Sequence, residues 1–103
     1  MEIRSTREGD HARMEVEGEL DIATGPRLDE AVGEVLEAGC TDIVVDLGGT
    51  TFLDSAGMSA LVRAVRSIDQ HGGRMRVLSP PGSEARVVLE MARIGDVVGL
   101  QDP

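Results

Sequence analysis

A serine and an aspartate stand side by side where a strand gives way to a helix. Residues 46–58 read DLGGTTFLDSAGM and join a β-branched apolar run to an amphipathic stretch, which places Ser55 at a helix N-terminus. Its hydroxyl could accept a hydrogen bond from a free first-turn amide, as an N-cap does, and Asp54 could fill that role equally well. The same hydroxyl could carry a phosphoryl group, because first-turn amides and the helix dipole stabilise an anion. The residues alone leave both roles open.

Two further residues bear on this choice. Glycine in the first turn of a helix is unfavourable for helix propensity, so Gly57 predicts a close approach to the backbone at this point. Asp21 precedes the first predicted helix as Asp54 precedes the second, and the strand-to-helix loops of a parallel sheet open at one edge. Asp21 is therefore either a turn or capping residue or part of an acidic rim around Ser55.

Histidine and cysteine offer little chemistry in this chain. His11 and His71 are sixty positions apart, and neither has the spacing that a metal site requires. Cys40 is the only cysteine, so there is no intramolecular disulfide, and we expect a partly buried thiol that packs as a small hydrophobic group. No metal or cofactor site is predicted.

Two enzymatic or metal-dependent alternatives compete with a binding role. A hydrolase would use Ser55 as nucleophile, but no histidine is a credible partner base for it. A magnesium-dependent receiver phosphorylated on aspartate would use Asp21, Asp46 and Asp54, although the chain contains no lysine to hold the phosphate. We therefore predict a protein that is not an enzyme, with the receiver kept as an alternative.

Length and composition predict a single domain over residues 1–103. Hydrophobic residues make up 41% and charged residues 28%, which is enough apolar material for a core. All ten basic residues are arginine, and the net charge of −9 argues against direct binding to nucleic acid. No run reaches the roughly 20 apolar residues of a membrane span, and the start has no signal-peptide pattern. We expect a cytoplasmic protein that does not bind a membrane.

The charge is concentrated in the first half of the chain. Residues 1–54 carry fourteen acids and four arginines, a net charge of −10, whereas residues 55–103 have a net charge of +1. The acidic half is either a solvated face that favours solubility or a docking face for a basic partner.

Apolar periodicity predicts the strands. Met14, Val16 and Leu20 alternate with charged residues, which indicates a strand with one exposed face, paired through a turn at residues 8–10 with a short strand around Ile3. The run from Ile43 to Leu47 is nearly continuous, as in a strand covered on both faces. After it we expect a flexible polar connection at residues 48–51, with Phe52-Leu53 anchored in the core. The remaining candidate strands are Met75–Leu78 and, as a short last one, Val97-Val98.

Helical periods lie between these strands. Thr24 and Pro26 predict the start of a first helix that ends at Gly39, and a second helix follows Ser55 as far as Gly72. A third is expected to begin near Ser83. The apolar positions assigned to the three helices are Leu28, Ala31, Val32, Val35 and Leu36; Met58, Leu61, Val62, Val65 and Ile68; and Val87, Val88 and Met91. The order β-β-α-β-α-β-α, with a possible final strand, predicts an α/β fold in which three principal helices cover a mixed, mainly parallel sheet of four or five strands.

Three segments together resemble one protein family. GELD at residues 18–21, VVDL at 44–47 and FLDSAG at 52–57, in this order and spacing, resemble the STAS-domain family of bacterial anti-sigma factor antagonists. The match spans essentially the whole chain, and the FLDSAG element is its specific part. Relatives often carry serine or threonine where this chain has Ala56, so Ser55 is the only hydroxyl between Asp54 and Gly57.

The resemblance implies a partner-switching protein. When unphosphorylated, such a protein binds an anti-sigma factor that is also a serine kinase, and so frees a sigma factor for transcription. The kinase, which would hold the ATP, then phosphorylates Ser55, and a serine phosphatase resets the switch. Thr50, Thr51 and Ser59 are the other hydroxyls near this element, and a module of a stress-signalling complex or a transporter remains an alternative within the family. We expect a monomer or weak dimer whose partner-binding residues are Asp21, Asp54, Ser55, Ala56, Gly57 and Met58.

Overall fold

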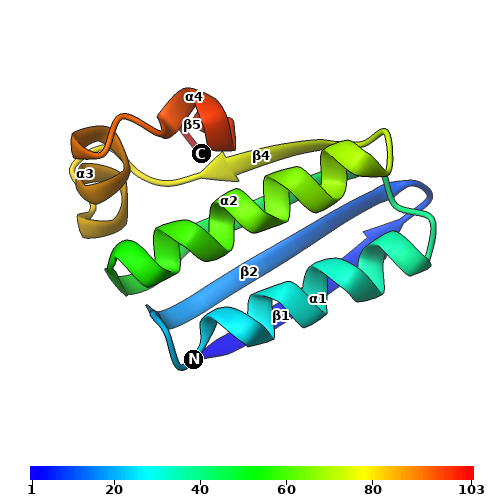
Figure 1. Cartoon of the computed structure of the whole chain (residues 1–103), viewed down its shortest axis with the longest axis horizontal. Coiled ribbons are helices and arrows are strands. Elements are labelled where there is room, and N and C mark those ends of the chain that lie inside the picture. Colours follow the sequence, from blue (N-terminus) through cyan, green and yellow to red (C-terminus); the bar gives the residue numbers. More distant parts are fainter.

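The computed structural model describes residues 1–103 and has the predicted order of elements, with one short helix added near the end. Figure 1 shows the arrangement. The strands are β1 (Glu2–Glu8), β2 (His11–Leu20), β3 (Asp42–Leu53), β4 (Arg74–Leu78) and β5 (Leu100–Gln101). The helices are α1 (Gly25–Glu37), α2 (Ser55–Gln70), α3 (Glu84–Met91) and α4 (Gly95–Val98). No helix combines the length and apolar character needed to cross a bilayer.

All five strands form one sheet in the order β1-β2-β3-β4-β5. β1 is antiparallel to β2, while the other neighbouring pairs are parallel, so the predicted mixed and mainly parallel sheet is confirmed. α1 and α2 pack against each other and lie side by side over one face of the sheet (Figure 1). Aliphatic side chains fill the space between these layers, and Cys40 is packed among them, more deeply buried than the partly buried thiol that was predicted.

The prediction that the central strand is covered on both faces is wrong. In β3 the buried residues Ile43, Val45 and Leu47 alternate with partly exposed ones, so helices cover only one side. Val44 lies on the open side, between Arg13 of β2 and Arg76 of β4 in the strand register. Arginine stems can shelter an apolar neighbour while their charged ends stay in water. A valine at this position therefore imitates the pattern of a fully buried strand.

The prediction of a flexible connection at residues 48–51 is also wrong, because β3 continues to Leu53. Pairing with β2 resumes beyond register shifts at Glu15/Glu17 and Gly18/Glu19, and the hydroxyl of Thr50 donates to the carbonyl of Val16 at 2.9 Å. These irregularities place extra residues on one strand, which obscures the period-two pattern in the sequence. Leu53 is buried as expected, whereas Phe52 is 40% exposed.

The C-terminal third departs most from prediction. α3 begins after its N-cap Ser83 as expected, but it buries Ala85 and Leu89, while Val87 is 42% and Met91 80% exposed. Val97-Val98, the candidate last strand, belongs to the short helix α4, and the final strand follows it as β5. A helix of eight residues is too short for its apolar period to show which side faces the core.

Candidate functional site

The first turn of α2 presents a free hydroxyl beside a working cap. Asp54 is the N-cap, and its Oδ1 accepts a hydrogen bond from the Gly57 amide at 2.9 Å. The first intrahelical bond runs from the Met58 amide to the Asp54 carbonyl. Ser55 is the first helical residue, is exposed, and its hydroxyl has no hydrogen-bond partner in the chain. The capping role that the sequence left open between the two residues therefore belongs to Asp54.

Gly57 allows the close packing that positions this turn. A Cβ at this position would lie 2.2 Å from the carbonyl oxygen of Leu20 and 2.7 Å from a methyl group of Leu53. Gly57 is buried in the chain, so its predicted place among the partner-binding residues stays a prediction, and its observed role is to support the turn. The close approach predicted from this glycine is instead that of the β2 backbone, which holds the start of α2 against the end of β2.

Asp21 lies at the same edge as Asp54. Leu20 and Leu53 are partners in the register of β2 and β3, so the two aspartates are the residues that follow a matched pair. Oδ1 of Asp21 accepts hydrogen bonds from the amides of Ala23 and Thr24 at 3.0 and 3.1 Å. In each aspartate Oδ1 serves the local turn, and Oδ2 has no partner in the chain. The two aspartates thus lie at one edge of the sheet, as the parallel topology predicts, and each shapes its own loop.

The other nearby hydroxyls differ from Ser55 in accessibility or bonding. Thr50 is 7% exposed, and its hydroxyl is engaged with the Val16 carbonyl. The Ser59 hydroxyl donates to the carbonyl of Ser55 at 3.0 Å. Thr51 is exposed and lies within β3. Ser55 is the one exposed, unbonded hydroxyl at the helix terminus.

Sequence reasoning missed part of the surface around this hydroxyl. Met58 and Val62, placed in the core stripe of the second helix, are partly exposed and line a groove that also includes Ser55 and Arg66. Ile22, next to Asp21, is 81% exposed. An isolated isoleucine in a predicted loop was the signal in the sequence for this exposed apolar surface.

The residues that the enzymatic alternatives require are not brought together. His71 is the C-cap of α2, at the opposite end from Ser55, and His11 begins β2 at the far end of the sheet from the β2–α1 loop. Asp46 lies on the open face of β3, bonded to Arg13 and to the Gly48 amide, and so does not join the other two aspartates of the proposed receiver. No group of three or more His, Cys, Asp or Glu side chains is arranged to hold a metal ion.

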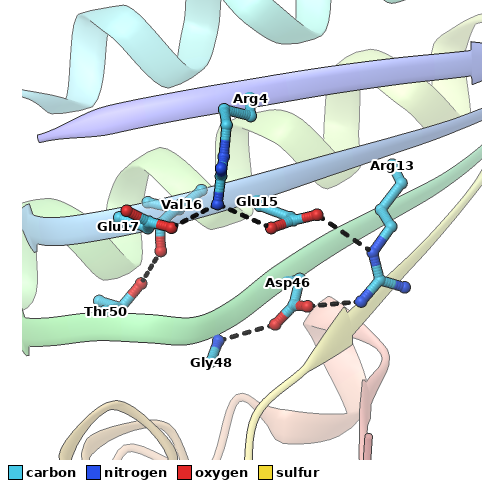
Figure 2. Close-up of polar contacts among 8 residues, drawn as sticks. All are labelled: Arg4, Arg13, Glu15, Val16, Glu17, Asp46, Gly48 and Thr50. Atoms are coloured by element: carbon cyan, nitrogen blue, oxygen red, sulfur yellow. Dashed lines mark hydrogen bonds and ion pairs between the residues drawn. The ribbon is translucent and has the colours of Figure 1, made fainter.

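The open sheet face carries a chain of ion pairs (Figure 2). Arg4 contacts Glu17 at 2.6 Å and Glu15 at 3.3 Å, while Arg13 contacts Asp46 at 2.5 Å and Glu15 at 3.9 Å. Three of the fourteen acidic residues in the first half of the chain are therefore paired with arginine in this network.

Comparison with known proteins identifies the family. The family model described as Mlab, STAS domain, matches residues 3–102. The chain belongs to the STAS domain family. The STAS relative from Staphylococcus epidermidis, named anti-sigma-B factor antagonist, is 28% identical over 102 residues, 99% of this chain and 88% of that protein.

Solved structures share this STAS fold. An anti-sigma factor antagonist from Mycobacterium paratuberculosis matches with a TM-score of 0.83 at 22% identity, over 99% of this chain and 86% of that one. The anti-sigma factor antagonist SpoIIAA in its unphosphorylated form matches with a TM-score of 0.81 at 18% identity, over 99% and 88%. The Bacillus cell fate determinant SpoIIAA in its phosphorylated form matches with 0.74 at 18%, over 99% and 91%.

Proposed function

We propose that this chain is an anti-sigma factor antagonist switched by phosphorylation of Ser55. In its unphosphorylated form it binds an anti-sigma factor that is also a serine kinase, and the sigma factor is released. The kinase binds ATP and transfers the phosphoryl group to Ser55, which ends the interaction, and a serine phosphatase restores it. The observation that carries the proposal is the exposed, unbonded Ser55 hydroxyl at the start of α2. The names of the relatives support it.

The geometry suits a reversible modification. Asp54 holds the helix end, so a group added to Ser55 displaces no hydrogen bond of the fold. First-turn amides that precede the first intrahelical bond already point out of the helix N-terminus and can donate hydrogen bonds to an anion. A phosphate here adds about −1.5 to −2 charge beside the carboxylates of Asp21 and Asp54. The expected switch is therefore repulsion and crowding at the surface, with little change in the backbone.

Phosphorylation by the purified kinase partner with ATP tests the assignment. We expect one phosphate by intact mass, located on Ser55 by fragmentation. Ser55→Ala should abolish incorporation while the circular dichroism spectrum stays unchanged. Thr51→Ala is the matched control, because it removes another exposed and unbonded hydroxyl, and it should be modified like the natural chain. Phosphate found on Thr51 or Ser59 would overturn the assignment.

A further inference from the structure

A groove runs along α2 from the Ser55 hydroxyl to the connection between α3 and α4. Its volume is about 550 Å³, and it is open to solvent. In Figure 1 the start of α2, the loop after β2 and α3 lie at the same end of the molecule. The groove is lined by Ser55, Met58, Ser59, Val62, Arg63, Arg66, Ala92 and Ile94. The candidate phosphorylation site thus lies at one end of a longer groove.

The floor of the groove is apolar. Met58, Val62 and Ile94 pack against the hydrophobic core on one side and are partly exposed to the groove on the other. Met58 and Val62 are one turn apart on α2, so they form a continuous strip along the helix. Such a strip favours an apolar side chain of a partner.

The charge of the groove is opposite to that of the chain. Its lining contains two arginines and no Asp or Glu, in a protein with nineteen acidic residues and a net charge of −9. Arg63 is partly neutralised by Asp29 at 3.3 Å. Arg66 is exposed and makes neither an ion pair nor a side-chain hydrogen bond. The cation available to a ligand is therefore the Arg66 guanidinium, which pairs well with a carboxylate.

We propose that this groove binds an acidic segment of the anti-sigma kinase, with an apolar side chain against Met58 and Val62 and a carboxylate on Arg66. The inference rests on the proposed function and adds the chemistry of the partner. It also gives the phosphate a second effect. Ser55 lines the same groove, so its phosphate would repel a segment whose negative charge Arg66 attracts in the unmodified protein.

A charge reversal with a matched control tests the groove. Arg66→Glu and Arg74→Glu change the net charge equally, and both arginines are exposed and without an ion pair. Arg74 begins β4, beyond the C-terminal end of α2 and far from Ser55. By calorimetry with the kinase that phosphorylates Ser55, we expect Arg66→Glu to weaken binding by about tenfold or more, and Arg74→Glu by less than about twofold. Equal affinities of the two variants for the kinase would overturn the proposal that the groove binds it.

The proposed function has a separate readout in the same experiment. If the two variants bind equally but phosphorylation of Ser55 still abolishes binding, the groove proposal fails and the switch stands. If the unmodified chain neither binds the kinase nor accepts phosphate, the proposed function fails, and the assignment of this partner fails with it.

A peptide probe tests the chemistry without the kinase. Backbone NMR is recorded while a peptide of alternating glutamate and leucine is added, and again with alternating lysine and leucine. We expect shifts at Met58, Val62, Arg66 and Ile94 with the glutamate peptide, reduced in Arg66→Glu and at most weak with the lysine peptide. Equal responses to both peptides, or no response to either, contradict the proposal.

Discussion

The open sheet face and the Ser55 end of the molecule use polar residues in opposite ways. On the sheet face, Arg4 and Arg13 link three carboxylates into a chain of ion pairs, so the charges there satisfy one another (Figure 2). At the start of α2 the Ser55 hydroxyl has no partner, and Arg66 in the same groove has none either. Groups that are unsatisfied inside the chain are the ones available to another molecule.

We expect a modification to disturb the chain's own contacts less at Ser55 than on the sheet face. A charge added to the sheet face would enter a network whose distances are already set, whereas a charge added to Ser55 meets solvent and first-turn amides. The structural work at the Ser55 end is done by its neighbours, Asp54 and Gly57. Asp54 and Gly57 thus stabilise the turn, while the adjacent Ser55 stays available to another molecule.

The largest expected effect is at the glycine that supports the site. Gly57→Ala should destabilise the protein by about 1–3 kcal/mol, because the new methyl group would collide with the Leu20 carbonyl. Gly33→Ala is the control, since nothing lies within 4 Å of a Cβ there in the middle of α1. It should stabilise the protein by about 0.5–1 kcal/mol through helix propensity. Urea unfolding measures both, and a gain in stability from Gly57→Ala would contradict the close approach.

A smaller loss of stability is expected when the N-cap Asp54 is replaced, and almost none when Ser55 is replaced. Asp54→Ala removes the hydrogen bond to the Gly57 amide and should cost about 1 kcal/mol. Ser55→Ala removes a hydroxyl without a partner and should change the free energy of unfolding by less than about 0.5 kcal/mol. The same urea titrations compare the two neighbours directly. A larger loss in Ser55→Ala than in Asp54→Ala would return the capping role to the serine.

The smallest effect is expected on the sheet face. Arg13→Ala breaks its exposed contacts with Glu15 and Asp46 and should cost less than about 1 kcal/mol, with a difference that shrinks further in salt. Its affinity for the kinase should stay within about twofold of the natural chain, because the proposed docking surface lies on α2 and not on this face. A tenfold loss of affinity with unchanged stability would give the sheet face a role in binding.

The sequence was sufficient for the order of elements and for the edge at which the site lies. Strand and helix periods are long in β2, α1 and α2, and parallel topology brings Asp21 and Asp54 to one edge whatever the details of packing. The predictions failed for short or irregular elements, where the buried side or the extent of the element was misjudged. The extra residues that β3 carries at its register shifts against β2 disguised the far half of β3, and α3 is too short to show its buried side.

Within the candidate site, the residue types were predictable but their division of labour was not. Two adjacent residues can each cap a helix, and only the backbone path shows that Asp54 does so and leaves Ser55 free. The groove was hidden for a related reason. Met58 and Val62 fit the apolar period of α2, and the period does not reveal where neighbouring elements stop covering the helix.

In the proposed function, phosphate on Ser55 switches partner binding by local charge. Against a partner carboxylate roughly 5 Å away, each added unit of charge costs about 3 kcal/mol at an effective dielectric near 20, before salt screening. About 2.7 kcal/mol already corresponds to a hundredfold change in affinity. One such contact is therefore enough for a switch.

Calorimetry measures the affinity of the unmodified, phosphorylated and Ser55→Ala proteins for the kinase. Backbone NMR of the same free proteins shows whether the phosphate changes their structure. We expect Ser55→Ala to bind like the unmodified protein and the phosphorylated protein to bind at least about a hundredfold more weakly. NMR shifts caused by phosphate should stay within the first turns of α2 and the adjoining loops. Equal affinities would remove the switch, and shifts spread through β1 or β4 would replace local repulsion with a conformational mechanism.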